Sequence, residues 1–489
     1  MKKDISIFIS EKPLKMLCLG FSSGLPILLV FSTLSVWLIK AGVTRSTVTL
    51  FSWAGFAYAF KYLWSPLIDN YNLHIFKSFG HRRSWLILTQ IFIILSLLAT
   101  SITNPQNSLF LTASAITLLA FSSATQDIII DAYRIESAPQ HMQGPLSSMY
   151  IAGYRVAMLV GGAGSLWLAA YFGQDNYNQE VWQKVYSIMS IFMLVGIFGT
   201  LISKEPKIKR EKNLKNHHHA RFFLTVVMSV ACFIYSYSKL NNPFSEDQIL
   251  FGFIFAISRI VFCFLIVFTI IYFFTLINFV STKSIKKSYL NPITNFVSRY
   301  GKFAFFILLL ISLYRIADVV MGVMANIFYL EKGYNISQIA TYSKFFGVFA
   351  TIVGGFIGGY FSYKYGTMKA LFFGAFIAAS SNLLFAWLAS SPISIKFLIT
   401  VITADNISSG FAGAAFVIYL SGLTSIKFTA TQYALFSSIM LFLPKLIAGY
   451  SGGWVDLIGY QNFFILTAIL GVPVLLLIIW IGKFAPIKD

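Results

Sequence analysis

Almost the whole chain consists of long apolar segments, each of which could cross a lipid bilayer as a helix. About 20 mainly apolar residues are needed to span the hydrocarbon core of a bilayer, and fourteen segments meet this length. They cover approximately residues 14–40, 46–68, 84–103, 107–133, 145–172, 182–203, 221–239, 249–279, 303–330, 336–363, 367–390, 396–423, 428–455 and 461–482. Only 11% of the 489 residues are charged, against about 25% in soluble domains. The sequence therefore predicts an all-α polytopic membrane protein with 14 spans.

The positive charges between these segments alternate in a way that predicts the orientation of the chain. Starting with the N-terminus, alternate loops hold 25 Lys and Arg residues, and the other loops hold six. Because cytoplasmic loops of membrane proteins are enriched in Lys and Arg, we expect both termini in the cytoplasm. The net charge of +20 is spread over short loops, so the expected partners are a lipid bilayer and a small molecule, and no nucleic acid.

Two polar stretches, 204–220 and 280–302, flank the segments 221–239 and 249–279. Without these two segments, six remain before and six after. This pattern is typical of parallel repeats in transporters. It predicts an N-terminal six-helix half (1–203), cytoplasmic linkers with two additional membrane helices (204–302), and a C-terminal six-helix half (303–489).

The segment 119–137, LAFSSATQDIIIDAYRIES, places charges inside an apolar run. A charge at the centre of a bilayer costs roughly 2.5–3.5 kcal/mol on insertion scales, and such residues usually serve a substrate, an ion or a gate. Asp127, Asp131 and Arg134 are spaced i, i+4 and i+7, so a helix places them on one face. That face must point away from lipid, which indicates a transporter.

Other charges inside the segments leave alternatives open. Arg315 and Asp318, spaced i and i+3, can form a structural pair or a pair that switches beside a cavity, and Lys344 is an alternative partner for Asp318. Arg155 and Lys445 each precede a Gly-Gly pair, in opposite halves. Two cations facing one cavity would suit an anionic substrate, but each can equally pair with a nearby acid.

The remaining buried acid is Asp405, and the loop after the second segment carries Asp69, Arg82 and Arg83. We expect Lys61 to extend toward the inner surface and Asp69. The glycines of segments 145–172, 336–363 and 428–455 predict close helix packing, a sliding interface between the halves, or both. No catalytic motif or metal site is evident, because the histidines at 217–219 lie in a basic loop. A membrane-embedded enzyme acting on lipid-linked wall precursors and a non-transporting receptor are the competing hypotheses.

The chain resembles the major facilitator superfamily and, within it, the AmpG-type muropeptide permeases of Gram-negative bacteria. The matching strings are LGFSSGLP (19–26), YAFKYLWSPLID (58–69), SSATQDIIIDAY (122–133), AGYRVAMLVGG (152–162), YRIADV (314–319), ATIVGGFIGG (350–359), DNISSGFAGAAFV (405–417) and TATQYALFSS (429–438). The loop of Asp69 and Arg82–Arg83 matches the acidic-to-basic signature of the superfamily, although its glycine pattern does not.

The resemblance implies import of 1,6-anhydro-muropeptides across the bacterial inner membrane, by proton symport and alternating access, for peptidoglycan recycling. It implies that Gln126, Asp127, Asp318 and Lys344 serve the substrate and the proton. We expect no cofactor beyond the proton gradient, and a monomer. A related branch carries acetyl-CoA, so another anionic solute, such as a nucleotide-like or peptide-like metabolite, is the alternative. We further predict that Asp131, Arg155, Arg315, Asp405 and Lys445 contribute to the substrate and proton site, and that Asp69, Arg82, Arg83 and Arg134 form a gate.

Overall fold

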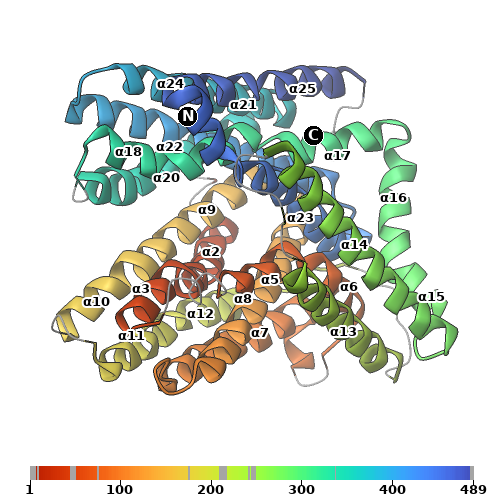
Figure 1. Ribbon diagram of the computed structural model, residues 1–489. Helices are drawn as coiled ribbons and strands as arrows, with labels where there is room; N and C mark the ends of the chain where they lie inside the picture. Colours follow the sequence, from red (N-terminus) through yellow and green to blue (C-terminus); the bar gives the residue numbers. More distant parts are fainter. Residues whose placement is uncertain are drawn as a thin grey trace.

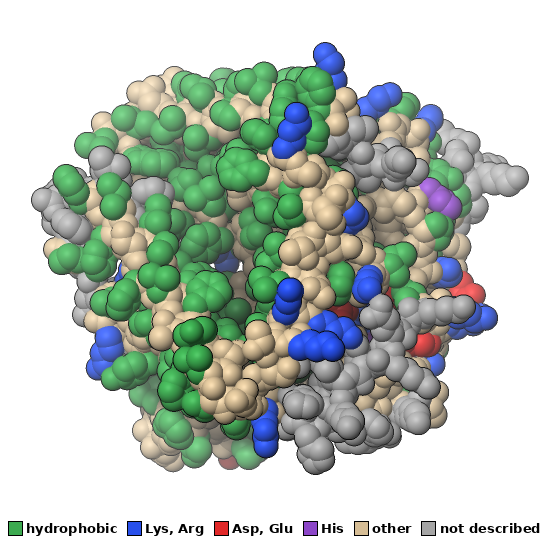
Figure 2. Space-filling view, turned by 90° about the vertical axis from the view of Figure 1, so that its right-hand side faces the viewer, with side chains coloured by type: hydrophobic (Ala, Val, Ile, Leu, Met, Phe, Trp, Pro, Cys, Tyr) green, Lys and Arg blue, Asp and Glu red, His purple; other side chains and the backbone are tan. Residues whose placement is uncertain are grey.

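The computed structural model describes residues 7, 10–43, 51–73, 76–173, 177–208, 217–240, 243, 249–335 and 338–484, and this part contains helices and no strand. Twelve of its helices or helix pairs are long and apolar enough to cross a membrane. Phe110 and Trp167 are 78% and 67% exposed, and hydrophobic side chains cover wide areas of the face in Figure 2. An outer surface of this kind suits lipid as the surrounding solvent, because water does not favour large exposed apolar areas.

The first half consists of helices shown from red to yellow-green in Figure 1. They are α2 (Glu11–Val30), α3 (Ser32–Lys40), η1 (Phe51–Gly55), α5 (Phe56–Ala59), η2 (Lys61–Leu63), α6 (Ser65–Asn70), η3 (Lys77–Phe79), α7 (His81–Ile102), α8 (Leu109–Ser137), η4 (Gln140–Met142), α9 (Gln143–Leu159), η5 (Val160–Gly164), α10 (Ser165–Phe172), α11 (Gln179–Phe192) and α12 (Leu194–Ile202).

Most of the second half lies above the first in Figure 1, coloured from green through teal to blue, and α23 lies lower, beside the first half. It contains α17 (Phe303–Leu313), α18 (Ile316–Lys332), η7 (Ile339–Phe346), α20 (Gly347–Tyr365), α21 (Thr367–Ser390), α22 (Ile395–Leu423), η8 (Ile426–Phe428), α23 (Thr429–Ala448), α24 (Ser451–Ile469) and α25 (Val472–Phe484). Gly459 has φ 76° and interrupts α24, between the predicted segments 428–455 and 461–482.

Between the halves, the chain forms α13 (His217–Lys239), α14 (Ile249–Leu276), α15 (Thr282–Ile285), η6 (Lys286–Leu290) and α16 (Asn291–Tyr300). The aromatic rings of Phe60, Phe233 and Phe264 pack together, which joins α13 and α14 to the first half. The Tyr289 hydroxyl donates a hydrogen bond to the Leu63 carbonyl.

The predicted count of 14 spans is not confirmed, since the described part contains 12 candidates. The two differences are the segments 46–68 and 221–239. Residues 44–50 lie outside the described residues, and 51–70 form four short helical pieces. Pro66 contributes to this break, because proline lacks the N–H that a continuing helix would use. In α13 the apolar part is limited to Leu224–Tyr237, which is shorter than a bilayer requires.

The described residues form two large hydrophobic cores and a small third one in α13 and α14, around Phe233 and Cys263. One large core is built almost entirely from the helices before α13 and includes Trp37 and Tyr186, and the other is built mainly from α16 to α25 and includes Phe385 and Phe464. Between the halves, α9 packs on α20 and α22, while α23 packs on α5, η2, α6 and α8. Asp127, Asp131, Arg134 and Arg155 lie on these helices, whereas Arg82 lies on α7 and Asp318 on α18.

Glycines allow the closest helix contacts inside each half. A methyl group added at Gly24 would meet the Tyr154 carbonyl of α9, and one added at Gly358 would meet the Phe411 carbonyl of α22 at 2.6 Å. Small residues permit this approach of backbones in membrane helices. The predicted close packing is therefore confirmed for the pairs α2–α9 and α20–α22.

Candidate functional site

Asp127 is a buried carboxyl group held by hydroxyl groups of neighbouring helices. It is 9% exposed, and its Oδ1 accepts a hydrogen bond from Ser23 Oγ of α2 at 2.5 Å. Ser23 Oγ also lies 3.0 Å from the Tyr150 hydroxyl of α9. Among the described residues, no Lys, Arg or His lies within ion-pair distance of Asp127. Its charge, when present, is therefore balanced only at longer range, by Lys61.

Asp131 lies one turn further along α8 and has two cationic neighbours. Lys61 Nζ is 3.8 Å from Asp131 Oδ2, and Arg134 Nη2 is 3.2 Å from Asp131 Oδ1. The expectation that Lys61 reaches toward Asp69 is wrong, since its ammonium group lies beside Asp131 and the residue is 8% exposed. Asp69 is bound to Arg82 instead, whose Nη2 lies 2.8 Å from its Oδ1.

Arg134 is fully buried and connects the two halves. Its Nη1 donates to Ser147 Oγ of the first half at 2.9 Å and to Ser421 Oγ of α22 at 2.8 Å. The guanidinium lies 5.9 Å from the ring centroid of Tyr150 and 5.3 Å from that of Tyr433 in α23. The contacts of Arg134 thus include three helices beyond its own.

Gln126 does not share the hydrogen bonds of its neighbour Asp127. Its side chain is fully buried, and neither its Oε1 nor its Nε2 has a partner within the described residues. Buried amides are normally hydrogen-bonded. Gln126 is therefore not part of the hydrogen-bonded group of Ser23, Asp127 and Tyr150, and its contacts do not indicate a function.

A second set of contacts joins the halves near the end of α8. Arg82 Nη2 lies 2.8 Å from Asp69 Oδ1 and 2.5 Å from Glu136 Oε1. Asp69 also accepts hydrogen bonds from the backbone N–H groups of Ala430 (3.1 Å) and Thr431 (2.9 Å), in the first turn of α23. A carboxylate is stabilised at such a helix N-terminus by free N–H groups and the helix dipole.

Close backbone packing completes this end of the molecule. Ser148 Oγ donates to the Gly355 carbonyl of α20 at 3.0 Å, and a methyl group added at Gly144 would meet the Gly359 carbonyl at 2.6 Å. We call this region, with Asp69, Arg82, Arg134, Gly144 and Ser148 on the first half, the closed end.

Arg83 does not take part in the closed end. Its Nε donates to the Thr200 carbonyl at 3.1 Å and its Nη2 to the Leu201 carbonyl at 2.9 Å. Both carbonyls belong to the last turn of α12, where a cation satisfies free carbonyl groups. The prediction that Arg83 acts with Arg82 in a gate is therefore not supported by its contacts, which stay inside the first half.

In the second half, Arg315 and Asp318 form the ion pair that their spacing predicts. Ser409 Oγ of α22 lies 3.4 Å from both Arg315 Nη2 and Asp318 Oδ2. Asp405, one turn earlier in α22, interacts electrostatically with both members of the pair. One guanidinium thus faces two carboxyl groups within this half.

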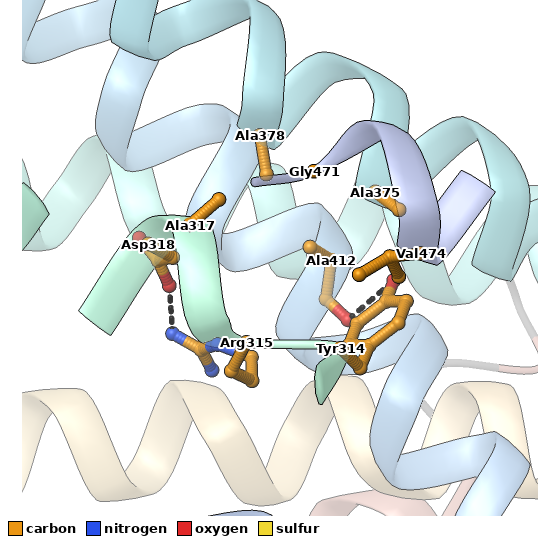
Figure 3. Close-up of a pocket in the computed structure, with 9 residues that line it drawn as sticks. All are labelled: Tyr314, Arg315, Ala317, Asp318, Ala375, Ala378, Ala412, Gly471 and Val474. Carbon is orange, nitrogen blue, oxygen red and sulfur yellow. Dashed lines mark hydrogen bonds and ion pairs between the residues drawn. The ribbon is translucent and has the colours of Figure 1, made fainter. Parts of the chain in front are cut away.

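A small cavity of about 10 Å³ lies beside the pair, enough for roughly one water molecule. It is lined by Tyr314, Arg315, Ala317, Asp318, Ala375, Ala378, Ala412, Gly471 and Val474. Figure 3 shows that Tyr314 reaches toward the Ala412 carbonyl, whereas the Arg315 guanidinium points toward Asp318. This cavity is too small for a sugar, so it is a hydration site at most.

The three remaining cations predicted for the site differ in their positions. Arg155 of α9 interacts electrostatically with Arg315 and Asp318, across the boundary of the halves. Lys445 of α23 is exposed, and no described contact joins it to Arg155. The side chain of Lys344 lies outside the described residues, so the alternative Asp318–Lys344 pair stays a prediction.

Sequence analysis missed the polar groups that hold the predicted charged residues from other helices. Ser23 donates to Asp127 and lies beside the Tyr150 hydroxyl, Glu136 accepts from Arg82, and Ser421 accepts from Arg134. A lone hydroxyl in an apolar segment commonly bonds to its own helix, so the sequence alone does not mark these residues as partners of charged groups on other helices. Glu136 was the exception, because it follows Arg134 at the same charged end of a predicted span.

Comparison with known proteins gives a consistent result along the chain. The family described as Major Facilitator Superfamily matches residues 16–291. A Rickettsia conorii protein named "Putative transporter AmpG 4" is 31% identical over 97% of this chain and 98% of its own length. The anhydromuropeptide permease of Escherichia coli is 28% identical over 97% of this chain and 80% of its own length.

Solved structures share the fold at low sequence identity. The proton:xylose symporter XylE superposes with a TM-score of 0.59 and 13% identity, covering 99% of this chain and 96% of its own. The fucose:proton symporter of E. coli gives a TM-score of 0.59 and 10% identity, covering 96% and 98%. These two likenesses concern the arrangement of helices alone.

Proposed function

We propose, from the premise that this chain belongs to the major facilitator superfamily and to its AmpG-type transporters, that it imports 1,6-anhydro-muropeptides by proton symport. The substrates are GlcNAc–anhydroMurNAc with or without a short peptide, and the process is peptidoglycan recycling. The name of the E. coli relative, an anhydromuropeptide permease, supports this substrate class.

Asp127 is the observation that carries the proton part of the proposal. It combines burial, a hydroxyl donor and no counter-ion within ion-pair distance among the described residues. A carboxyl group in this state can bind and release a proton without breaking a direct ion pair. Each proton that enters down the membrane potential supplies about 2.3 kcal/mol per 100 mV, which drives accumulation of the substrate.

Alternating access then follows from rocking of the halves 1–203 and 303–489 about a central site. The contacts of Asp69, Arg134 and Ser148 with the second half hold the closed end together. We place both termini and the closed end in the cytoplasm, as the distribution of Lys and Arg indicates. The structure then represents a conformation closed toward the cytoplasm, which receives substrate from the periplasm.

The remaining parts of the proposal concern topology and assembly. We count the broken segment 46–68 as the sixth span of the first half, and we assign 204–302 to linkers with two additional membrane helices, which gives fourteen spans in total. Packing of Phe60 against Phe233 and Phe264 supports a position of these helices beside the first half. The protein works as a monomer in the bacterial inner membrane, with the proton gradient as its only driving force.

Uptake into proteoliposomes tests this function. Labelled GlcNAc–anhydroMurNAc, with and without a tripeptide, is offered to vesicles with an inward proton gradient, and again after the gradient is collapsed with an ionophore. Gradient-dependent accumulation is expected, and unlabelled acetyl-CoA should not compete. Equal accumulation with and without the proton gradient would contradict symport. Uptake of acetyl-CoA in place of the disaccharide would contradict the proposed substrate class.

A further inference from the structure

Arg155 of α9 is a half-buried cation with no carboxylate partner among the described residues. Its Nη1 makes one hydrogen-bond contact within the described residues, to Met158 Sδ at 3.8 Å, and no described acid lies within ion-pair distance. A thioether is a weak acceptor. Since arginine inside membrane proteins is normally paired or faces a water-filled path, the guanidinium of Arg155 has free donors available to a ligand.

Arg315 lies on the other side of the boundary between the halves and shares the neighbourhood of Arg155. The two guanidinium groups and Asp318 interact electrostatically, and α9 packs against α22, which carries Ser409 and Asp405. In Figure 3 the Arg315 guanidinium lies just above a pale yellow helix, the colour of α9 in Figure 1, with one nitrogen toward Asp318 and the other toward this helix. The two arginines therefore approach one space from opposite halves.

The charges described for this group balance before any ligand arrives. Arg155 and Arg315 contribute two positive charges, and Asp318 and Asp405 contribute two negative charges when both are ionised. An anion entering this low-dielectric region leaves one uncompensated negative charge, which is strongly unfavourable. Uptake of a single proton by one of the two carboxyl groups restores the balance.

We propose that Arg155 and Arg315 together bind one carboxylate of the substrate, and that Asp318 gives up Arg315 to it by taking a proton. The Arg315–Asp318 ion pair breaks, a hydronium ion from the periplasmic solution transfers its proton to a carboxylate oxygen of Asp318 and becomes water, and the substrate carboxylate takes the place of Asp318 on Arg315. Nothing else is gained or lost. The site rests on the proposed function and specifies the chemical group that the transporter recognises.

The surroundings of Asp318 are compatible with this exchange. Ser409 Oγ stands 3.4 Å from both partners of the pair and can donate to either one. Asp405, Tyr314 and Arg155 are the other described titratable or charged groups that face the pair. A guanidinium suits the task because its planar fork binds a carboxylate through two parallel hydrogen bonds. Because each half contributes one arginine, the substrate carboxylate can contact both arginines only when the two halves come together around it.

The test compares two probes that differ in one charge. GlcNAc–anhydroMurNAc carries a free lactyl carboxylate, and its methyl ester is neutral. Wild-type protein in proteoliposomes should favour the acid over the ester by about 10-fold or more in kcat/KM. Arg155→Gln should reduce this preference to within about threefold while uptake of the ester persists, and Arg155→Lys should restore part of it. Lys396→Gln, which removes an exposed cation near the start of α22, should leave the preference unchanged.

Proton counting supplies a second readout that a packing defect would not imitate. With a pH indicator inside the vesicles, wild type should move one more proton with each acid molecule than with each ester molecule. The double variant Arg315→Gln/Asp318→Asn, which removes the pair without leaving a lone charge, should lose this difference. A wild type that transports acid and ester equally, or an Arg155→Gln variant that keeps the preference, overturns the two-arginine site and leaves the proposed function standing. Absence of uptake for both probes in wild type would instead refute the proposed function.

Discussion

Asp69 Oδ2 accepts a hydrogen bond from the backbone N–H of Thr431 at 2.9 Å, so a carboxylate of the first half caps a helix of the second. Thr431 Oγ1 donates to the same oxygen at 2.8 Å. On its other side, Asp69 is bound to Arg82, which also holds Glu136. The cap breaks when the halves separate at the closed end, whereas the contacts of Arg82 belong to the first half alone. We therefore predict that Asp69 stabilises the conformation in which the halves meet at the closed end.

Asp69→Asn should shift the conformational equilibrium away from the closed end. The amide is uncharged, so its interactions with the N-terminus of α23 and with Arg82 are weaker than those of the carboxylate. The closed conformation therefore loses about 1–3 kcal/mol of stabilisation from the helix dipole and the buried pair together. Spin labels at Lys204 and Lys427, both exposed near this end, should show a larger population of long distances. Glu205→Gln is the control, because Glu205, just after the first half, binds the backbone of Arg82 and Arg83 in that half. Equal distance distributions for Asp69→Asn and wild type would remove Asp69 from the closed end.

Asp127→Asn should separate proton coupling from substrate exchange. The amide keeps the size of the side chain and a hydrogen-bond acceptor for Ser23, but it cannot carry a proton across. We expect gradient-driven accumulation to fall below about a tenth of the wild-type level, because the protonation cycle drives net uptake. Exchange of labelled for unlabelled substrate, which needs no net proton movement, should persist.

The matched control for this change is Asp456→Asn, which alters an exposed acid of α24. Its accumulation should equal that of wild type. Normal gradient-driven accumulation by Asp127→Asn would show that the coupling proton is carried elsewhere, with Asp318 and Asp405 as the next candidates.

Hydrophobic length and charge spacing made part of this molecule predictable. The i, i+4, i+7 pattern located Asp127, Asp131 and Arg134 on α8, and the i, i+3 pattern gave the Arg315–Asp318 pair. Both inferences depend on residues in one helix, where periodicity fixes which side chains are neighbours. The broken segment 51–70 was predicted as one span because its composition is apolar, although Gly55 and Pro66 interrupt it.

Contacts between helices were not accessible in the same way. Ser23 and Asp127 are 104 residues apart in sequence, and nothing in the local pattern of α2 distinguishes Ser23 from Ser22. Lys61 was assigned to the wrong acid for the same reason: its distance along the chain favoured Asp69, whereas helix packing brings it to Asp131. Long-range pairings of this kind are set by how helices pack, and one sequence does not specify that packing.

Lys61 and Asp131 should show measurable coupling in a double-mutant cycle. Lys61→Met leaves Asp131 paired with Arg134, so we expect a moderate loss of thermal stability in detergent, about 1–3 kcal/mol. Asp131→Asn leaves two buried cations without their acid, and removal of one partner of a buried pair costs about 3–5 kcal/mol. The double variant should be more stable than the sum of the two losses indicates, by about 0.5–3 kcal/mol. Lys184→Met, at an exposed lysine of α11, provides the baseline. Strict additivity would mean that the 3.8 Å approach contributes nothing.

Gly359→Ala should oppose closure without disturbing either half. A methyl group at this position would meet Ser148 Oγ and, at 2.9 Å, the Gly144 carbonyl, both on α9 of the other half. Overpacking of this kind costs typically 1–3 kcal/mol, and here the cost falls only on the conformation with the closed end joined. The labels at Lys204 and Lys427 should therefore report longer distances, and uptake should slow. Gly355→Ala, one turn earlier on α20, meets Ile151 Cγ2 at an ordinary 3.6 Å and should behave as wild type. If both variants behave alike, then contact between α9 and α20 does not limit the conformational cycle, and closure must depend on the polar contacts of Asp69 and Arg134.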